Sequence, residues 1–372
     1  MIGVGSIVDG KYELVSIAGQ GGMATVYRAQ VRGAAGFARS VAIKRMRPEF
    51  RDVQSYIDMF VEEARVGAEL AHPNIVQVYD FATDADGAYY LVMEWVDGID
   101  MSTWLAGQGK DGKPVAWPLA VSIVLDTLRG LGAAHERRRA DGTLAPVVHR
   151  DVSPHNVLVG TSGVAKLSDF GLARARDRVA KLTAPGTVKG KLAYMAPEVS
   201  HGAQASPRSD LFAVGCMLWE ALAGHRPFEG KNDIEVFRRI RECNPAPLAP
   251  LRPDLPPALI DILNRTLTKS PDDRFQSAQL MASALRDVVQ RTGHDVEASP
   301  AVAASVRELQ GANKAPPAPA MHSATTEVKT DGATRPVANA QPQPAPNYAD
   351  DDGSVDVQFS VVDMPIPPNT KR

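Results

Sequence analysis

Two hydrophobic patterns follow each other along the first 290 residues of the chain. Residues 11 to 96 hold short runs rich in Val, Ile and Tyr between turn residues, which is typical of β-strands. The strands predicted from these runs are Lys11–Ala18, Thr25–Val31, Ser40–Met46, Ile75–Thr83 and Ala88–Val96. One helix, Tyr56–Leu70, interrupts them, because its apolar residues recur at helical spacing and His72-Pro73 follows it. This part of the pattern predicts a small, strand-rich lobe with a single helix.

Beyond residue 100 the long segments have helical periodicity instead. The predicted helices are Pro118–Arg139, Ser209–Ala223, Asp233–Arg241, Pro257–Thr268 and Ser277–Arg291. We therefore expect an α+β fold of two lobes, a β-rich N-lobe at about residues 10–96 and a larger, mainly helical C-lobe at about 100–290. The cleft between two such lobes is a natural ligand site.

The composition changes after residue 290. Prolines gather in runs such as residues 315–319 and 341–346, in a background rich in Ala, Thr and Asp. A segment without sustained apolar periodicity cannot bury enough surface to offset its chain entropy. We therefore predict that residues 291–372 form a disordered Pro/Ala-rich tail, with a polyproline-type docking segment as the alternative.

Charge and cysteine content exclude several classes of protein. A formal net charge of −2 argues against general electrostatic binding of nucleic acid, which usually requires a strongly basic domain. No run approaches the roughly 18 apolar residues of a membrane span, and the first residues do not resemble a secretory signal. Cys216 and Cys243 have no Cys or His neighbours at metal-binding spacing. We expect buried or partly buried thiols in a cytoplasmic protein.

A glycine-rich turn lies between the first two predicted strands, where residues 19–24 read Gly-Gln-Gly-Gly-Met-Ala. Such a turn exposes backbone N–H groups that can approach phosphate oxygens. A flexible turn without a ligand is the alternative, because Ala24 stands where a third glycine would be expected. A strand follows the turn, and no Gly-Lys-Ser/Thr ending is present, which argues against a dinucleotide fingerprint and a P-loop.

Four further motifs follow this turn along the chain. They are Val41-Ala42-Ile43-Lys44, His149-Arg150-Asp151 with Asn156 after four further residues, Asp169-Phe170-Gly171 and Ala196-Pro197-Glu198. A lysine at the end of an apolar strand or a single tripeptide has ordinary structural explanations. Five motifs in this order and at this spacing do not, and together they resemble the protein kinase family over about residues 10 to 290.

The resemblance implies a two-lobed protein kinase fold and transfer of the γ-phosphate of ATP, which needs mostly positioning and charge neutralisation. Lys44 would hold the α- and β-phosphates while paired with Glu63. Glu63 is preferred over its neighbour Glu62, because it lies ten residues before Pro73, as in the family.

The same resemblance assigns the chemistry of the transfer to three residues. Asp169 and Asn156 would bind Mg²⁺, with Mn²⁺ as an alternative. Asp151 would accept or orient the proton of the attacking hydroxyl. Because these groups would converge on one point, their charges themselves call for a cation there.

The resemblance also places the contacts with the nucleotide. The apolar side chains of Val26, Ala42, Met93 and Leu158 would enclose adenine, and the backbone of Glu94 and Val96 would hydrogen-bond its edge. Asp100 would bind the ribose. The phosphates would be held by Lys44 and by the glycine-rich turn with its neighbours, which are Ala18, Gly19, Gln20, Gly21, Gly22, Met23 and Ala24.

Three further residues resemble architectural positions of the family. Asp210 matches the buried aspartate that holds the catalytic-loop backbone. Glu198 and Arg274 match an internal ion pair of the C-lobe. Loss of either partner of such a pair leaves a buried charge without its partner.

The chain departs from the family pattern at two linked positions. Ser153 stands where serine/threonine kinases usually have a lysine that contacts the γ-phosphate, and Lys191 stands where a threonine is usual. Our hypothesis is that Lys191 supplies the missing positive charge. The alternative is a solvent-exposed Lys191 and a merely tolerated Ser153.

Activation by phosphorylation is a further expectation from the resemblance. Thr187 lies eleven residues before Glu198, where the family carries its activating phosphothreonine, and Thr183 is a second candidate. A phosphate at Thr187 could pair with Arg150, and an unmodified threonine is the alternative.

The motifs together predict a bacterial, eukaryotic-like serine/threonine protein kinase that uses Mg-ATP and autophosphorylates. Its partners would be ATP and proteins bearing Ser or Thr, and a homodimer for phosphorylation between copies is compatible with this interpretation. A pseudokinase that signals as an ATP-binding scaffold is the alternative from another class. The presence of Lys44, Asp151, Asn156 and Asp169 argues against the pseudokinase, whereas Ser153 and Ala24 favour it.

Overall fold

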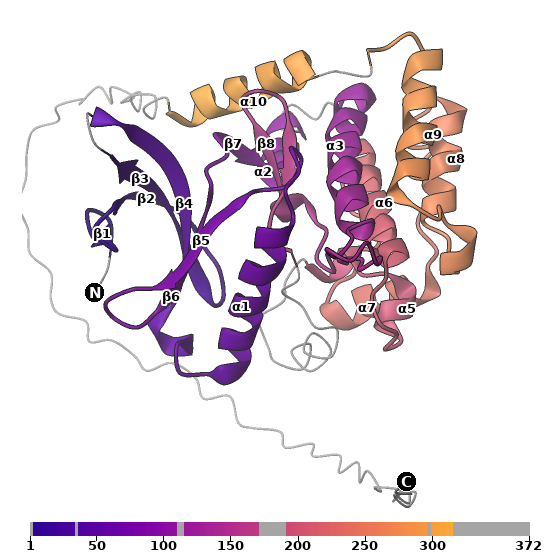
Figure 1. Ribbon diagram of the computed structural model, residues 1–372. Coiled ribbons are helices and arrows are strands. Elements are labelled where there is room, and N and C mark those ends of the chain that lie inside the picture. Colours follow the sequence, from indigo (N-terminus) through magenta and orange to yellow (C-terminus); the bar gives the residue numbers. More distant parts are fainter. Residues whose placement is uncertain (1–2, 34–35, 110–114, 171–190, 296–298, 315–372) are drawn as a thin grey trace, which may run out of the picture. The chain divides into compact units, whose positions relative to one another are not determined.

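The computed structural model describes residues 3–33, 36–109, 115–170, 191–295 and 299–314 of the chain. These residues form a β-sheet lobe followed by a mainly helical lobe (Figure 1). The α+β, two-lobed fold predicted from the sequence is therefore confirmed.

The N-lobe is built on an antiparallel sheet of six strands in the order β1-β2-β3-β4-β6-β5. The strands are β1 (Ile7–Val8), β2 (Tyr12–Gln20), β3 (Ala24–Arg32), β4 (Ala38–Met46), β5 (Val78–Thr83) and β6 (Tyr89–Glu94). Side chains of β4 alternate between two apolar clusters, because successive residues of a strand face opposite sides. Val41 and Ile43 pack in one cluster, and Ala42 packs in the other together with Phe60 of helix α1 (Gln54–Glu69). Lys44 shares the face of Ala42, so it is directed towards α1.

A second, three-stranded sheet follows the chain segment that joins the lobes. It consists of β7 (Gly98–Asp100), β8 (Val157–Gly160) and β9 (Ala165–Leu167), in which Asp100 pairs with Leu158. These strands are too short for a visible alternation of polar and apolar residues, and the sequence analysis did not predict them. A backbone contact makes glycine necessary at position 98, because an added Cβ would lie 2.0 Å from the carbonyl oxygen of Val159.

The C-lobe packs its helices around one apolar core. They are α2 (Met101–Gln108), α3 (Trp117–His135), α5 (Pro197–Ser200), α6 (Pro207–Ala223), α7 (Asp233–Glu242), α8 (Pro257–Thr266) and α9 (Ala278–Arg291). Short 3-10 turns occur at η2 (Pro48–Phe50), η4 (Pro154–Asn156), η5 (Lys191–Tyr194) and η6 (Pro271–Asp273). Helix α3 ends at His135, not at Arg139 as predicted, because the chain turns back through a hairpin in which Ala145 N donates to Arg137 O (2.8 Å).

The prediction that the folded part ends near residue 290 is wrong. Helix α10 (Ser299–Lys314) follows, and Figure 1 shows it running across the region of β7, β8 and α2. Its residues Val302, Ala303 and Val306 are buried, so a narrow apolar stripe in an alanine-rich segment is enough to hold the helix. Residues 315–372 lie outside the described part, and disorder there remains a prediction.

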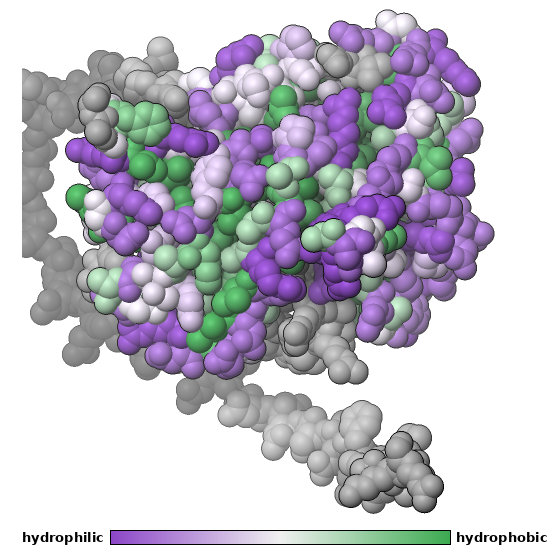
Figure 2. All heavy atoms as spheres, viewed as in Figure 1, coloured by the Kyte–Doolittle hydropathy of each residue, from purple (hydrophilic) through white to green (hydrophobic). Residues whose placement is uncertain are grey.

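Several hydrophobic side chains of the described residues are exposed at the surface. Figure 2 shows hydrophobic side chains reaching the surface near the sheet and α1, and a mostly hydrophilic surface over α8 and α9. Exposed hydrophobic residues near the sheet and α1 include Val53, Val61 and Tyr79, each about 40% exposed. Scattered exposure of this kind is ordinary for a folded protein.

No helix in the described part of the chain combines the length and the apolar character that a bilayer crossing requires.

Candidate active site

A buried lysine joins the two lobes. Lys44 on β4 donates to Glu63 of α1 (2.6 Å) and to Asp169 (2.5 Å), which follows β9. Lys44 and Glu63 are each less than a tenth exposed, whereas the Asp169 side chain is 33% exposed. The predicted partner Glu63 is the one found beside Lys44, and Glu62 instead pairs with Arg65.

The charged groups of this trio shift one another's pKa values. Burial opposes the charge on Lys44, but Asp169 and Glu63 beside it raise its pKa above the ordinary value. Burial raises the pKa of Glu63 to about 8, although Lys44 acts in the opposite direction. Both carboxylates accept from the single ammonium group of Lys44.

The predicted catalytic residues Asp151 and Asn156 lie side by side. The amide nitrogen of Asn156 donates to the carboxylate of Asp151 (Oδ2, 3.0 Å) and to its backbone oxygen (2.7 Å). Ser168 N donates to the carbonyl of Asn156 (2.9 Å), which brings the loop next to the segment that carries Asp169. Residues far apart in the sequence thus surround one polar site.

A buried aspartate of α6 holds this loop, as predicted. The carboxylate of Asp210 accepts from the backbone N–H groups of His149 (2.8 Å) and Arg150 (2.9 Å), and it contacts the imidazole of His135 (2.9 Å). Its side chain is 2% exposed. The backbone of the catalytic loop is therefore anchored to the C-lobe core.

Two non-glycine residues of the site have left-handed backbone conformations. Arg150 has φ of 68° and Asp169 has φ of 61°. This region is unfavourable for residues with a Cβ and persists where surrounding contacts enforce it. His149 links the two segments, because its Nε2 lies 2.9 Å from Ser168 O and its ring packs on Phe170.

The residues predicted to enclose adenine gather in one apolar cluster. Ala42 and Met93 are buried in it, and Val26, Val96 and Leu158 pack against it, together with Met23. These residues come from β3, β4, β6, the segment after β6, and β8. The structure therefore brings the expected adenine contacts together in one cluster.

The glycine-rich turn is a β-hairpin between β2 and β3, closed by Gly21 N donating to Ala24 O (2.8 Å). The residues expected to contact phosphates or lie beside them are Ala18, Gly19, Gln20, Gly21, Gly22, Met23 and Ala24. A Cβ at Gly19 or Gly22 would meet nothing within 4 Å, and neither residue has positive φ. Steric need within the chain therefore does not explain these two glycines.

Asp100, expected at the ribose, caps helix α2. Its carboxylate accepts from Thr103 N (3.0 Å) and Thr103 Oγ1 (2.7 Å). The side chain of His155 lies near the same carboxylate (3.9 Å). Nearby, the carboxylate of Glu94 at the end of β6 accepts from Lys166 of β9 (2.9 Å), a link that the sequence analysis missed.

The positions that depart from the family pattern are only partly described. Ser153 is 1% exposed, and within the described part of the chain its hydroxyl has no hydrogen-bond partner. Lys191 begins the turn η5, but its side chain is outside the described part, as are Thr183 and Thr187. The hypothesis that Lys191 replaces the usual lysine therefore stays a prediction.

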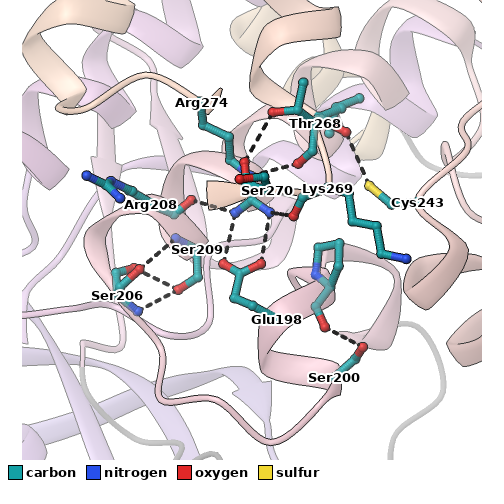
Figure 3. A network of polar contacts seen from close by, with 12 residues as sticks. Glu198, Ser200, Ser206, Arg208, Ser209, Cys243, Thr268, Lys269, Ser270 and Arg274 are labelled. Carbon is teal, nitrogen blue, oxygen red and sulfur yellow. Dashed lines mark hydrogen bonds and ion pairs between the residues drawn. The ribbon is translucent and has the colours of Figure 1, made fainter. Parts of the chain in front are cut away.

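The predicted ion pair of the C-lobe is confirmed (Figure 3). Arg274 donates twice to Glu198 (2.8 and 2.9 Å) and also to the carbonyl oxygens of Thr268, Lys269 and Arg208. Arg274 is fully buried, and its guanidinium lies over the ring of Phe212. This network ties α5 and the start of α6 to the loop after α8.

Comparisons with known proteins agree with this geometry. A family model described as a protein kinase domain matches residues 12–285. The chain is 42% identical over 276 residues to the tyrosine-protein kinase MasK of Myxococcus xanthus, and the aligned region covers 74% of this chain and 42% of MasK. It is 36% identical over 290 residues to the serine/threonine-protein kinase PknA of Mycobacterium tuberculosis, and that aligned region covers 77% of this chain and 63% of PknA.

A solved structure resembles the fold as well. The crystal structure of the Mycobacterium tuberculosis PknI kinase domain has a TM-score of 0.57 and 28% sequence identity, over 77% of this chain and 99% of that chain. The chain spans less than two thirds of the length of MasK and PknA. The family model, the relatives and the arrangement around Lys44 and Asp151 lead to one conclusion: the chain belongs to the bacterial eukaryotic-like protein kinase family.

Proposed function

We propose that this chain is a serine/threonine protein kinase, which transfers the γ-phosphate of Mg-ATP to protein hydroxyls and phosphorylates its own activation segment. Proteins of its family use ATP and a divalent metal ion. The observation that carries the proposal is the joint placement of Lys44, Glu63 and Asp169 beside the Asp151–Asn156 pair. The apolar cluster around Ala42 and Met93 supports adenine binding at the same place.

The residues present suit the proposed transfer. Lys44, held by Glu63, binds the α- and β-phosphates, and the hairpin backbone at Gly19 and Gly22 approaches the phosphate oxygens. The substrate hydroxyl oxygen bonds to the γ-phosphorus while the bond from phosphorus to the β,γ-bridging oxygen breaks, and ADP leaves. Asp151 accepts the hydroxyl proton, a role worth about 10²–10⁴ in rate for positioned bases.

The donor set near Asp169 fits a magnesium ion. Asp169 supplies a carboxylate and Asn156 an amide oxygen, and Mg²⁺ is usually held by one or two carboxylates together with substrate phosphates and waters. The described residues contain no group of three or more His, Cys, Asp or Glu side chains that could hold a metal ion. This agrees with an ion that ATP would help to hold. When bound, the ion neutralises phosphate charge, and Mn²⁺ could take its place.

The proposed phosphate acceptor is the hydroxyl group of serine or threonine. PknA is named a serine/threonine-protein kinase, whereas MasK is named a tyrosine-protein kinase. Tyrosine kinases usually carry an arginine within the catalytic loop, and none lies between Asp151 and Asn156. Serine and threonine are therefore preferred, and tyrosine is the second candidate because of the likeness to MasK.

The proposed partners are a protein substrate and a second copy of the chain, and the proposed location is the cytoplasm. The protein substrate bears Ser or Thr, and phosphorylation between two copies of the chain would modify Thr183 or Thr187. A cytoplasmic location is supported by the two cysteines, neither of which forms a disulfide.

Phosphate transfer from labelled Mg-ATP tests the proposal. Wild type should label itself, with phosphate mapped to Thr183 or Thr187, and Asp151→Asn should lose at least ~100-fold in rate. Phosphoamino-acid analysis distinguishes serine and threonine from tyrosine.

Lys191→Ala should lower kcat more than twofold, and a smaller effect would remove Lys191 from the mechanism. ATP binding without any transfer by wild type would instead identify a pseudokinase.

A further inference from the structure

Helix α10 contacts the strand that begins where the N-lobe ends. Gln310 Nε2 donates to the carbonyl oxygen of Gly98 in β7 (3.1 Å), and Arg307 Nη1 donates to Thr161 O after β8 (2.8 Å). Thr161 N in turn donates to Asp97 O, in the segment that joins the lobes (2.7 Å). The helix thus holds β7 and the residue directly after β8 by side-chain hydrogen bonds to their backbone.

A buried anchor fixes the position of α10. Trp104 of α2 is fully buried, and its indole nitrogen donates to Ser305 Oγ (2.9 Å), which is itself 8% exposed. Val302 and Val306 belong to the main core of the C-lobe. The helix is therefore a packed part of the domain and is not merely laid on its surface.

Two glycines allow this close approach. A Cβ at Gly107 of α2 would lie 2.4 Å from the side chain of Leu309. A Cβ at Gly163, in the turn between β8 and β9, would lie 1.9 Å from the carbonyl oxygen of Ser299. Both α2 and the β8–β9 turn therefore present a glycine where α10 passes.

The strands that α10 holds carry two of the expected nucleotide contacts. Asp100 ends β7 only two residues after Gly98, and it pairs in register with Leu158 of β8. Leu158 packs against the apolar cluster that contains Ala42 and Met93. A shift of β7 relative to β8 would move Asp100 and Leu158 together.

We propose that α10 is a positioning element of the nucleotide site, with Gln310 as the residue that holds β7, and hence Asp100 and Leu158, in the geometry that binds ATP. This inference rests on the proposed ATP-dependent function. It assigns to the segment after the C-lobe helices a role in nucleotide affinity, without contact between α10 and the reacting atoms.

The test compares isosteric and donor-retaining variants of Gln310 in the full chain. Gln310→Glu keeps the size of the side chain but offers the Gly98 carbonyl no N–H donor, whereas Gln310→Lys retains a donor. Glu308→Gln on the exposed side of the helix is the matched control. The probe is the fluorescent nucleotide mant-ATP with Mg²⁺, and KM for ATP, kcat and the thermal midpoint without nucleotide are measured for the same four proteins.

For Gln310→Glu we expect mant-ATP binding and KM for ATP to weaken about fivefold, within the range of a lost hydrogen bond to a part-buried acceptor. kcat should stay within twofold, and Gln310→Lys and Glu308→Gln should match wild type. Hydrogen exchange should increase at residues 98–105 in Gln310→Glu.

Equal nucleotide affinity in Gln310→Glu and wild type overturns the inference while leaving the proposed function in place. A lower thermal midpoint with unchanged affinity also overturns it, because α10 would then be only a structural element. Absence of mant-ATP binding by wild type overturns the proposed function itself, and the inference with it.

Discussion

At the scale of single residues, the site is made by backbone conformations that contacts elsewhere enforce. Arg150 and Asp169 adopt positive φ, each at a cost of about 1–3 kcal/mol for a residue with a Cβ. The carboxylate of Asp210 offsets the cost at Arg150 by accepting from its N–H and from that of His149. His149 then contacts the backbone at Ser168, directly before Asp169. The residues proposed to be catalytic are thus oriented by Asp210 and His149, which have no proposed part in the chemistry.

The two cysteines give a prediction at this scale. Burial raises the pKa of Cys243 to about 11 and also raises the pKa of Cys216. Because the thiolate is the reactive form, we expect folded protein at pH 7.5 to react with DTNB at least ~100-fold more slowly than the same chain in urea. The rate for Cys243 should rise about tenfold per pH unit up to pH 11. Stoichiometric labelling of folded protein within seconds at pH 7.5 would contradict this.

At the scale of elements, the C-lobe depends on ion pairs that differ in burial. The network of Arg274 connects three elements through a guanidinium that is withdrawn from water (Figure 3). The pair between Arg208 and Asp272 lies close by, but the Asp272 side chain is 85% exposed. Solvent screens such an exposed pair, so the two interactions should contribute very different amounts to stability.

Glu198→Ala should lower the free energy of unfolding by about 3–5 kcal/mol, because it leaves the buried Arg274 charge without its partner. The measurement is urea unfolding followed by circular dichroism. Asp272→Ala is the matched control and should change the free energy by at most about 1 kcal/mol. The double variant Glu198→Ala with Arg274→Leu should lose less than the sum of the two single losses. Additive losses would mean that the two side chains are not coupled.

At the scale of the whole molecule, the folded unit extends beyond the last predicted helix. The described residues from 3 to 314 form one compact unit, which includes α10. The apolar residues of α10 join the core that α3, α6 and α9 also form. The tail that was predicted to begin at residue 291 therefore contributes its first segment to the domain.

Two truncations test this boundary. A chain ending at residue 317 should keep the thermal midpoint of the full chain within about 2 °C, since the remaining composition predicts no packed core. A chain ending at residue 298 should melt at least ~5 °C lower, because Val302 and Val306 leave the core and the Trp104 indole loses its acceptor. Equal midpoints for the two truncated chains would show that α10 is not bound to the domain.

Much of the fold and of the candidate site could be predicted from local pattern. The apolar run in residues 40–46 predicts a strand, and the face that Ala42 shares with Lys44 follows from the period of two along a strand. The resemblance to the protein kinase family, which the ordered motifs carry, predicts that Asp151, Asn156 and Asp169 share one site, and their residue types suit phosphoryl transfer. The ion pair between Glu198 and Arg274 could be predicted from the same resemblance.

The remaining features depend on contacts between distant segments, which local pattern does not encode. Strands β7 to β9 are three or four residues long, so they exist only through pairing with each other. Helix α10 was missed because its weak apolar stripe has a partner only where Trp104 and the β7–β8 pair come together. The sequence by itself determined the motifs that carry the family resemblance and the order of the lobes, since motif spacing and periodicity are local properties. Tertiary structure alone decided the strained conformations of Arg150 and Asp169, and the docking of α10, because both need packing from elsewhere in the chain to offset their cost.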